Sequence, residues 1–109
     1  MGKNLEIDAS RWPEIHAVAC RLVEMLNPEA IYLYNQRAGE HGKSLGFKLC
    51  VVAAIDDKAR AERAVYTEID CEVPFDILLY TPPEWAALSA SEGSFASKIF
   101  RTGTILYGE

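Results

Sequence analysis

Residues 30–55 read AIYLYNQRAGEHGKSLGFKLCVVAAI, and this stretch decides the fold. It contains two apolar runs rich in β-branched and aromatic residues, Ile31 to Tyr34 and Phe47 to Ile55, and both are predicted to be buried strands. In the second run, alternate residues on both faces are mostly apolar, which is typical of a central strand covered on both sides. The segment between the runs, Asn35 to Gly46, is polar and glycine-rich, so we expect a surface connection whose backbone amides could also cradle phosphate.

A helix is predicted on each side of this strand pair. Before it, apolar residues recur at three- and four-residue spacing over 11–26, with Ser10 as the helix cap. After it, Asp56 or Asp57 can cap a short helix over 57–68, because carboxylates are favoured at helix N-termini. The two predicted helices would pack against the sheet.

The last third of the chain is predicted to hold two strands and two short helices. Asp76 is the single charge of an apolar strand, so its carboxylate is expected to need a partner. The predicted elements are a strand over Val73 to Tyr80, a helix opened by the capping box Thr81-Pro82-Pro83-Glu84, a helix over Phe95 to Arg101 with Phe95, Ile99 and Phe100 inward, and a strand over Thr104 to Tyr107.

Length and charge limit the fold and the partners. The 109 residues have room for one core, so we expect a single domain over 1–109, an α/β (α+β) fold with a small mixed β-sheet packed by helices. A net charge of −5 without a run of lysine or arginine argues against a nucleic-acid partner. The N-terminus has no apolar h-region and no stretch approaches about 18 apolar residues, so we expect a cytoplasmic protein without a membrane contact.

The cysteines and histidines are not expected to carry chemistry. Cys20, Cys50 and Cys71 are an odd number with wide spacing, which fits neither a zinc motif nor a disulfide framework, so they are interpreted as core thiols. His16 lies off the densest apolar stripe of its predicted helix, which favours a solvated or partly packed side chain over a ligand. No metal site is predicted from these residues.

Several phrases resemble the minimal (MNT-type) nucleotidyltransferases of the DNA polymerase β-like superfamily. That family's first strand ends in a phrase like LFGSRARGE, where a Gly-Ser pair opens a helical turn on the nucleotide's phosphates. Here Leu33 to Glu40 reads LYNQRAGE, one residue shorter. The family's SDIDLLVV, VDVVVYTPEE and GVVLYG phrases are similar to Phe47 to Val52, Val73 to Glu84 and Gly103 to Gly108, so the resemblance covers nearly the whole chain.

The residues that would do the chemistry differ from the family pattern. Aligned on the second strand, the two metal-binding aspartates of the family fall at Gly46 and Lys48, and only the third carboxylate, Asp76, is present. The Gly-Ser pair is replaced by Asn35-Gln36, which is followed by Arg37. Two-metal transfer needs carboxylates at i and i+2 of one strand with a third from a neighbouring strand, and an ammonium group at Lys48 occupies the place of a divalent cation.

The resemblance therefore implies a catalytically degenerate, small prokaryotic-type module that binds or regulates, with antitoxin-like character. Its partners would be a helical protein of the HEPN type or a second copy, with a nucleotide as a further ligand and no cofactor. Two alternatives stay open. One is an active nucleotidyltransferase that uses Mg²⁺ with atypical ligands from Asp56, Asp57 or Glu40. The other is an unrelated α/β interaction domain.

The nucleotide-site equivalents in this sequence give one sharp geometric prediction. They are Asn35, Gln36, Arg37, Gly46, Lys48 and Asp76. Lys48 falls on the strand face that matches Asp76, so we expect the two to face one another on neighbouring strands as a direct or water-bridged ion pair that compensates a partly buried carboxylate.

Overall fold

The two central strands form a hairpin that is longer than its sequence predicts. The computed structural model describes residues 4–5, 12–40 and 44–108. In it β2 (Ala30–Ala38) and β3 (Ser44–Val52) pair antiparallel over nearly their whole lengths. The prediction of a loop over 35–46 was therefore wrong for most of that segment. Asparagine, glutamine and arginine have modest strand propensity, but the two strands form hydrogen bonds to each other's backbone along this stretch.

The second central strand also ends earlier than predicted. β3 stops at Val52 rather than at Ile55, and Val52 is the last residue of β3 that pairs with either neighbouring strand, through Ala30 on one side and Tyr80 on the other. One further hydrogen bond, from the Ala53 N–H to the Tyr80 carbonyl at 3.0 Å, follows before the chain leaves the sheet. A strand persists only as far as it has a partner, so the apolar run alone did not define its end.

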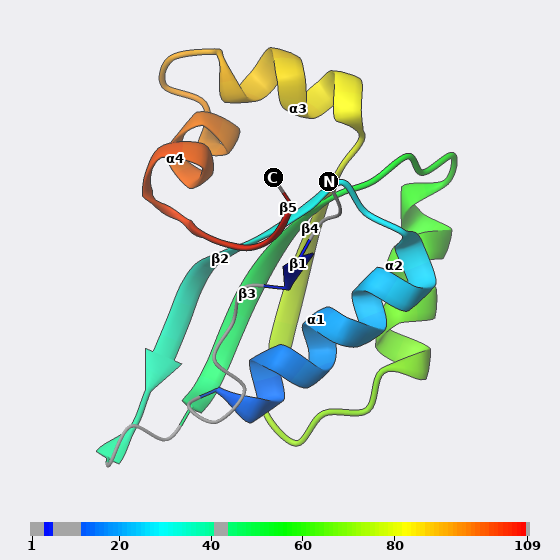
Figure 1. The fold of residues 1–109 in the computed structure, drawn as a ribbon, viewed down its shortest axis with the longest axis vertical. Helices are drawn as coiled ribbons and strands as arrows, with labels where there is room; N and C mark the ends of the chain where they lie inside the picture. Colours follow the sequence, from blue (N-terminus) through cyan, green and yellow to red (C-terminus); the bar gives the residue numbers. More distant parts are fainter. Residues whose placement is uncertain (1–3, 6–11, 41–43, 109) are drawn as a thin grey trace.

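The remaining strands complete a mixed sheet. β4 (Phe75–Tyr80) lies parallel to β3, and β5 (Thr104–Gly108) pairs antiparallel with β2. A two-residue strand that the sequence did not predict, β1 (Asn4–Leu5), pairs with β5, so the order is β1-β5-β2-β3-β4. The parallel pair requires a crossover connection, which contains α2 (Lys58–Glu68). This is the α+β arrangement that the sequence predicts (Figure 1).

Helix ends follow the local capping chemistry. α1 (Pro13–Leu26) begins two residues later than predicted, with proline in its first turn, and the predicted cap Ser10 lies outside the described residues. It ends at Asn27, whose φ of 45° is left-handed. α2 is capped as predicted, because the Asp57 carboxylate accepts a hydrogen bond from the Arg60 N–H at 3.1 Å.

The two C-terminal helices also start at side-chain caps. α3 (Pro82–Ser89) has the predicted capping box, in which Thr81 accepts from the Glu84 N–H and the Glu84 carboxylate accepts from the Thr81 N–H. α4 (Phe95–Thr102) is capped by Ser94, which accepts from the Ser97 N–H at 3.0 Å. At the end of α4, a Cβ on Gly103 would come within 2.7 Å of the Ile99 carbonyl, so the tight exit of the chain requires glycine.

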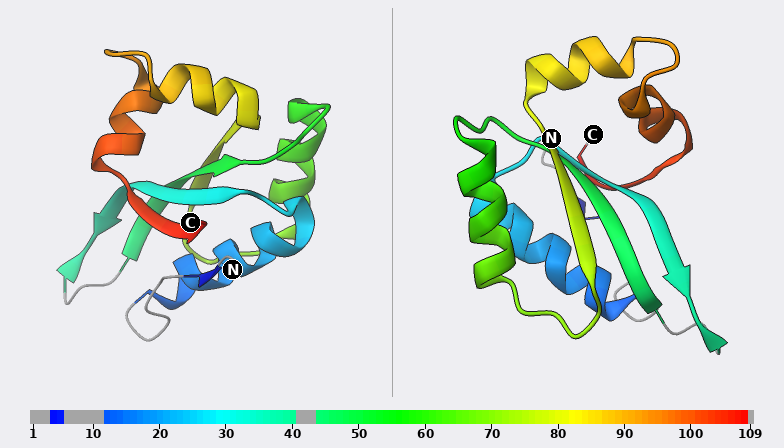
Figure 2. Two further views of the ribbon diagram at one scale, coloured as in Figure 1. Left: turned by 45° about the horizontal axis from the view of Figure 1, so that its top comes forward. Right: turned by 180° about the vertical axis from the view of Figure 1, so that it is seen from behind.

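The main core lies between one face of the sheet and helices α1 and α2, which lie side by side on that face (Figures 1 and 2). The strands contribute alternate residues, as the period of two requires. The fully buried residues of this core include Ile15, Val18, Ala19 and Leu22 of α1, Val65 of α2, and Ile31, Leu49 and Val51 of the strands.

The opposite face of the sheet is covered by α3 and α4 over only part of its length (Figures 1 and 2). The helices dock there through aromatic contacts, with the Trp85 ring centroid 5.2 Å from that of Tyr32 and 5.4 Å from that of Tyr80. The prediction that Phe95 and Phe100 point inward from α4 was wrong, because their side chains are 51 % and 56 % exposed. Ile99 is buried, as predicted, and Ala96 and Ser97 are buried in place of the two phenylalanines, since their small side chains let the helix approach the sheet closely.

Two polar contacts of α2 tie it to other elements. The Tyr66 hydroxyl accepts a hydrogen bond of 2.8 Å from the Ile77 N–H of β4. The Lys58 ammonium lies 2.6 Å from the Glu84 carboxylate of α3, which connects the helices on opposite faces of the sheet. Both side chains of this ion pair are about two-fifths exposed, so its contribution to stability is small. The described part of the chain has no helix long and apolar enough to cross a membrane.

Candidate functional site

A row of polar side chains crosses three strands where the cover of α3 and α4 ends. Lys48 of β3 is in register with Asn35 of β2 on one side and with Asp76 of β4 on the other. Two pairings further along, Arg37 is opposite Gly46. Because residues in register on neighbouring strands project to the same face, Asn35, Lys48 and Asp76 share the face of the sheet that carries α3 and α4.

A β-bulge in β2 shapes this row. Leu33 is opposite Leu49 and Asn35 is opposite Lys48, so Tyr34 is an extra residue in β2. A bulge changes the direction of successive side chains, and here both Tyr34 and Asn35 line the same cleft. Without it, Tyr34 would take the position opposite Lys48. The bulge thus places an aromatic ring and an amide side by side.

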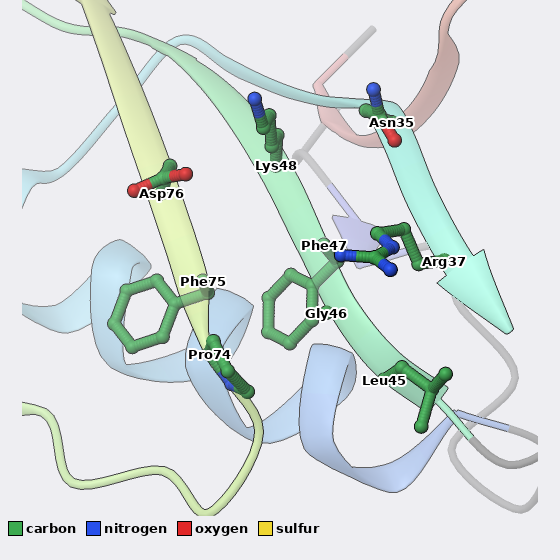
Figure 3. Close-up of a pocket in the computed structure, with 9 residues that line it drawn as sticks. All are labelled: Asn35, Arg37, Leu45, Gly46, Phe47, Lys48, Pro74, Phe75 and Asp76. Carbon is green, nitrogen blue, oxygen red and sulfur yellow. The ribbon is translucent and has the colours of Figure 1, made fainter. Parts of the chain in front are cut away.

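Two adjoining cavities share Asn35 and Lys48. The smaller has a volume of about 190 Å³ and includes Arg37, Gly46 and Asp76 in its lining (Figure 3). The structure therefore brings together five of the six predicted nucleotide-site equivalents. The wall is completed by apolar groups from β3, β4 and the turn before β4, namely Leu45, Phe47, Pro74 and Phe75.

The sixth predicted residue, Gln36, is not part of this site. It pairs with Phe47, whose side chain belongs to the main core, so Gln36 lies on the other face of the sheet. Its Nε2 is buried and has no hydrogen-bond partner among the described residues. The structure therefore places Asn35 and Gln36 on opposite faces of the sheet, because consecutive residues of an extended strand point to opposite faces.

The larger cavity, of about 570 Å³, extends from Lys48 toward α4. Its aromatic walls are Tyr34, Tyr80 and Phe95, and the Phe95 ring packs edge-on against Tyr34 with centroids 5.5 Å apart. Lys98 adds a second ammonium group to the lining. Sequence reasoning missed Lys98 and assigned Phe95 to the core; their i, i+3 spacing on one helix, together with the small residues between them, was the available signal.

The charges of the site are exposed and do not neutralise one another. Lys48 and Asp76 lie opposite one another as predicted, but both side chains are exposed and no ion pair joins them. The predicted direct ion pair is therefore absent, and the prediction that Asp76 is partly buried was wrong, because α3 and α4 do not reach its end of β4. Arg37, Lys48 and Lys98 likewise form no ion pair with a described residue.

The phenols of the cleft are neutral at neutral pH, and burial moves their pKa further above it. Burial raises the pKa of Tyr34 above its ordinary value, and nearby negative charges, including that of Asp76, act in the same direction. Burial also raises the pKa of Tyr80. Both rings therefore offer neutral hydroxyl groups beside two ammonium groups at neutral pH. This combination suits a ligand with an aromatic part and a negative charge.

The site is poorly suited to a divalent metal. Within the ranges 4–5, 12–40 and 44–108, no three His, Cys, Asp or Glu side chains lie close enough together to hold one. The carboxylates considered as substitutes lie elsewhere: Asp57 caps α2, and Asp56 and Glu40 do not line either cavity. Asp76 is the one carboxylate in the lining of the smaller cavity.

Comparison with known proteins identifies no family for the chain. No protein-family model matches it, and neither a curated protein nor a solved structure matches it. The structure supports a small α+β domain with a mixed sheet, and the site must be interpreted from its own residues.

Proposed function

We propose that this protein is a nucleotidyltransferase-like binding module that takes a nucleoside phosphate without transferring its nucleotidyl group. The observation that carries the proposal is the position of Lys48, an exposed ammonium group without an ion-pair partner among the described residues, where two cavities meet. The resemblance places a metal-binding carboxylate at this position. A fixed positive charge there binds phosphate directly and takes over the neutralising role of a metal ion.

In this proposal the larger cavity binds the nucleobase, and the phosphates lie at the junction of the two cavities. Tyr34, Tyr80 and Phe95 give the larger cavity aromatic surface on which a nucleobase can stack. Lys98 and Lys48 are cations for the phosphate at the junction, and Arg37 extends the positive charge into the smaller cavity. A base with attached phosphates matches this order of apolar and cationic surface. Neither cavity supplies the paired carboxylates that metal-dependent transfer requires.

The rival function is an active transferase with atypical carboxylate ligands. It would need Asp56, Asp57 or Glu40 close to Asp76. Asp57 already accepts a backbone hydrogen bond at the start of α2, and the three are absent from the lining of the cavity that contains Asp76. The binding function is therefore the better supported of the two.

The proposal extends to a protein partner, a helical protein of the HEPN type or a second copy of the chain. Its support is the exposed apolar surface of α3 and α4, formed by Leu88, Phe95 and Phe100, which are 40 %, 51 % and 56 % exposed. Four other aromatic residues, Trp12, Trp85, Tyr34 and Tyr107, are half-buried against the two cores. Sedimentation velocity and pull-down from native extract test this part: a strictly monomeric chain that recovers no partner would refute it.

Calorimetric titration with ATP, GTP, CTP and UTP, with and without Mg²⁺, tests the ligand. We expect at least one nucleotide to bind equally well without the metal, and Lys48→Ala to weaken it by roughly tenfold or more, the effect of a charge-assisted contact. Arg63→Ala, at an exposed cation of α2 that lines neither cavity, is the matched control and should leave the affinity unchanged. Binding that requires Mg²⁺, or incorporation of radiolabel from an NTP that Asp76→Asn abolishes, would overturn the proposal. So would the absence of binding.

A further inference from the structure

The two cavities that meet at Lys48 offer more room than a nucleoside phosphate needs. The larger one alone, of about 570 Å³, has the volume of an ordinary small-molecule site, roughly 300–1,000 Å³. A base with its sugar and first phosphate can therefore be held there. The smaller cavity, of about 190 Å³, lies on the other side of Lys48 and leaves space for a further part of the ligand.

The carboxylate in the smaller cavity does not suit a chain of further phosphates. Asp76 is exposed, is in register with Lys48, and forms no ion pair with a described residue. A second phosphate that continued from Lys48 into this cavity would bring a negative charge close to that carboxylate. A carboxylate accepts hydrogen bonds, so the neighbour that Asp76 favours is a donor such as a sugar hydroxyl group.

Arg37 adds a cation beyond the position of that hydroxyl group. It is exposed, is opposite Gly46 in the β2–β3 hairpin, and its guanidinium group extends toward β3 (Figure 3). Because Gly46 has no side chain, backbone forms the floor of the cavity there, and an extended ligand can pass over it. A guanidinium group binds phosphate through two parallel hydrogen bonds. Aromatic surface, cation, hydroxyl acceptor and second cation thus follow one another in the order of base, phosphate, ribose and next phosphate along a nucleic-acid strand.

The net negative charge of the chain is not located in these cavities. The segments that contain α1 and α2, residues 12–29 and 53–74, hold nine acidic and four basic residues, an excess that accounts for the net charge of −5. The two cavities are lined by three cations, Arg37, Lys48 and Lys98. Asp76 is the one carboxylate among their described lining residues. A polyanion that approaches the cavities therefore meets a local excess of positive charge.

We propose that the ligand of the two cavities is a short segment of single-stranded RNA. One base stacks on the aromatic walls of the larger cavity, and the phosphate that follows it binds Lys48. The next ribose donates its 2′-hydroxyl to Asp76, and the phosphate after it binds Arg37. This inference rests on the proposed nucleotide site and specifies its substrate class. Since the 2′-hydroxyl distinguishes RNA from DNA, Asp76 is the residue that selects RNA.

Calorimetric titration at low salt, without Mg²⁺, tests this proposal with three ligands for each base. They are the nucleoside 5′-monophosphate, an RNA tetranucleotide and the same tetranucleotide as DNA, with adenine, cytosine or uracil at every position. For at least one base, we expect the RNA tetranucleotide to bind at least tenfold more tightly than the monophosphate, because it makes additional phosphate contacts. We expect it to bind about tenfold more tightly than the DNA, which lacks the donor for a charged acceptor.

Three variants assign the contacts, with circular dichroism as the check that each one folds. Asp76→Ala should remove the preference for RNA over DNA. Arg37→Ala should weaken both tetranucleotides, leave the monophosphate affinity unchanged, and reduce the slope of log affinity against log salt by about 0.7, the value for one phosphate contact to a single strand. Arg63→Ala, at an exposed cation of α2 outside both cavities, is the matched control and should change none of the affinities.

The outcomes separate this inference from the function on which it rests. A monophosphate that binds as tightly as the RNA tetranucleotide would overturn the RNA proposal and leave the nucleotide-binding function in place. Absence of binding by every ligand would overturn both. A preference for RNA that survives Asp76→Ala, or equal affinities for RNA and DNA in the unaltered chain, would also overturn the RNA proposal.

Discussion

The two faces of the sheet are made by the same alternating strands, yet one is closed and the other is half open. Against α1 and α2, alternate residues of β3 from Phe47 to Val51 are buried. On the other face, Cys50 is buried under α3 and α4, whereas Lys48, two residues away, is exposed. The faces differ in the extent of their helical cover, and the boundary of that cover is where the cleft forms.

This comparison separates stability from function along one strand. The closed face holds most of the buried apolar side chains, so the free energy of unfolding should depend mainly on it. The half-open face has a small buried cluster. Next to it lie charged and aromatic side chains that line the larger cavity and are not needed for the packing of the core. Substitutions at neighbouring positions of β3 should therefore have very different effects.

The largest effect is expected on the closed face. Leu49→Ala removes a side chain that is 0 % exposed from the centre of the main core, so we expect the free energy of unfolding to fall by about 2–5 kcal/mol. Urea denaturation measures this. Leu88→Ala on α3 is the control, because its side chain is 40 % exposed and the change should be about 0.5 kcal/mol or less. Equal losses in the two variants would break the comparison.

An intermediate effect is expected at Cys50, on the covered part of the second face. Burial raises the pKa of its thiol from 9.0 to about 12. The unfolded chain loses this proton at a lower pH than the folded chain does. The contribution of the protonated Cys50 thiol to the free energy of unfolding is therefore complete below about pH 9 and is lost as the pH rises toward about 12. Chemical denaturation at a series of alkaline pH values should show this fall.

The control for the denaturation series is Cys50→Ala. This variant should lack the part of the fall in unfolding free energy that begins near pH 9. A later fall should remain, because burial also raises the pKa of Tyr32 and Tyr34 above 10.0. Thiol labelling of the folded protein gives a second measurement: Cys20 and Cys71 should react quickly, and Cys50 only on unfolding. Rapid labelling of Cys50 would show that α3 and α4 do not hold the second face closed.

The smallest effect is expected in the open part of the second face. Lys48→Ala and Asp76→Asn should each change the free energy of unfolding by about 0.5 kcal/mol or less, because both side chains are exposed and no ion pair joins them. A double-mutant cycle should give a coupling energy near zero. A coupling above about 1 kcal/mol would mean that the two side chains pair in solution and close the site.

The sequence predicted the register of the site better than its environment. The resemblance implied that Lys48 and Asp76 face one another on neighbouring strands, and the two residues are in register. It did not reveal that Asp76 is exposed, since that depends on how far two short helices reach across the sheet. Phe95 and Phe100 were misassigned for the same reason: a helix of eight residues presents several apolar sides, and tertiary packing selects among them.

Strand lengths were set by pairing rather than by composition. Asn35, Gln36 and Arg37 have no strong strand propensity, yet they continue β2 because β3 lies alongside them. The bulge at Tyr34 was also invisible in the sequence, although it decides which polar side chain faces Lys48. By contrast, the caps at Asp57 and Thr81 were predicted correctly, because a cap depends on residues within one turn.

The hydrogen bond from the Ile77 N–H to the Tyr66 hydroxyl has a consequence for how molecules of this protein meet in solution. β4 is the outermost strand on its side of the sheet, and a strand in that position offers free backbone donors that can template the addition of a strand from another molecule. Tyr66 occupies the donor at the middle of β4 and places an aromatic ring over that border. This contact leaves one fewer free donor on the edge strand, which disfavours edge-to-edge pairing of this small domain.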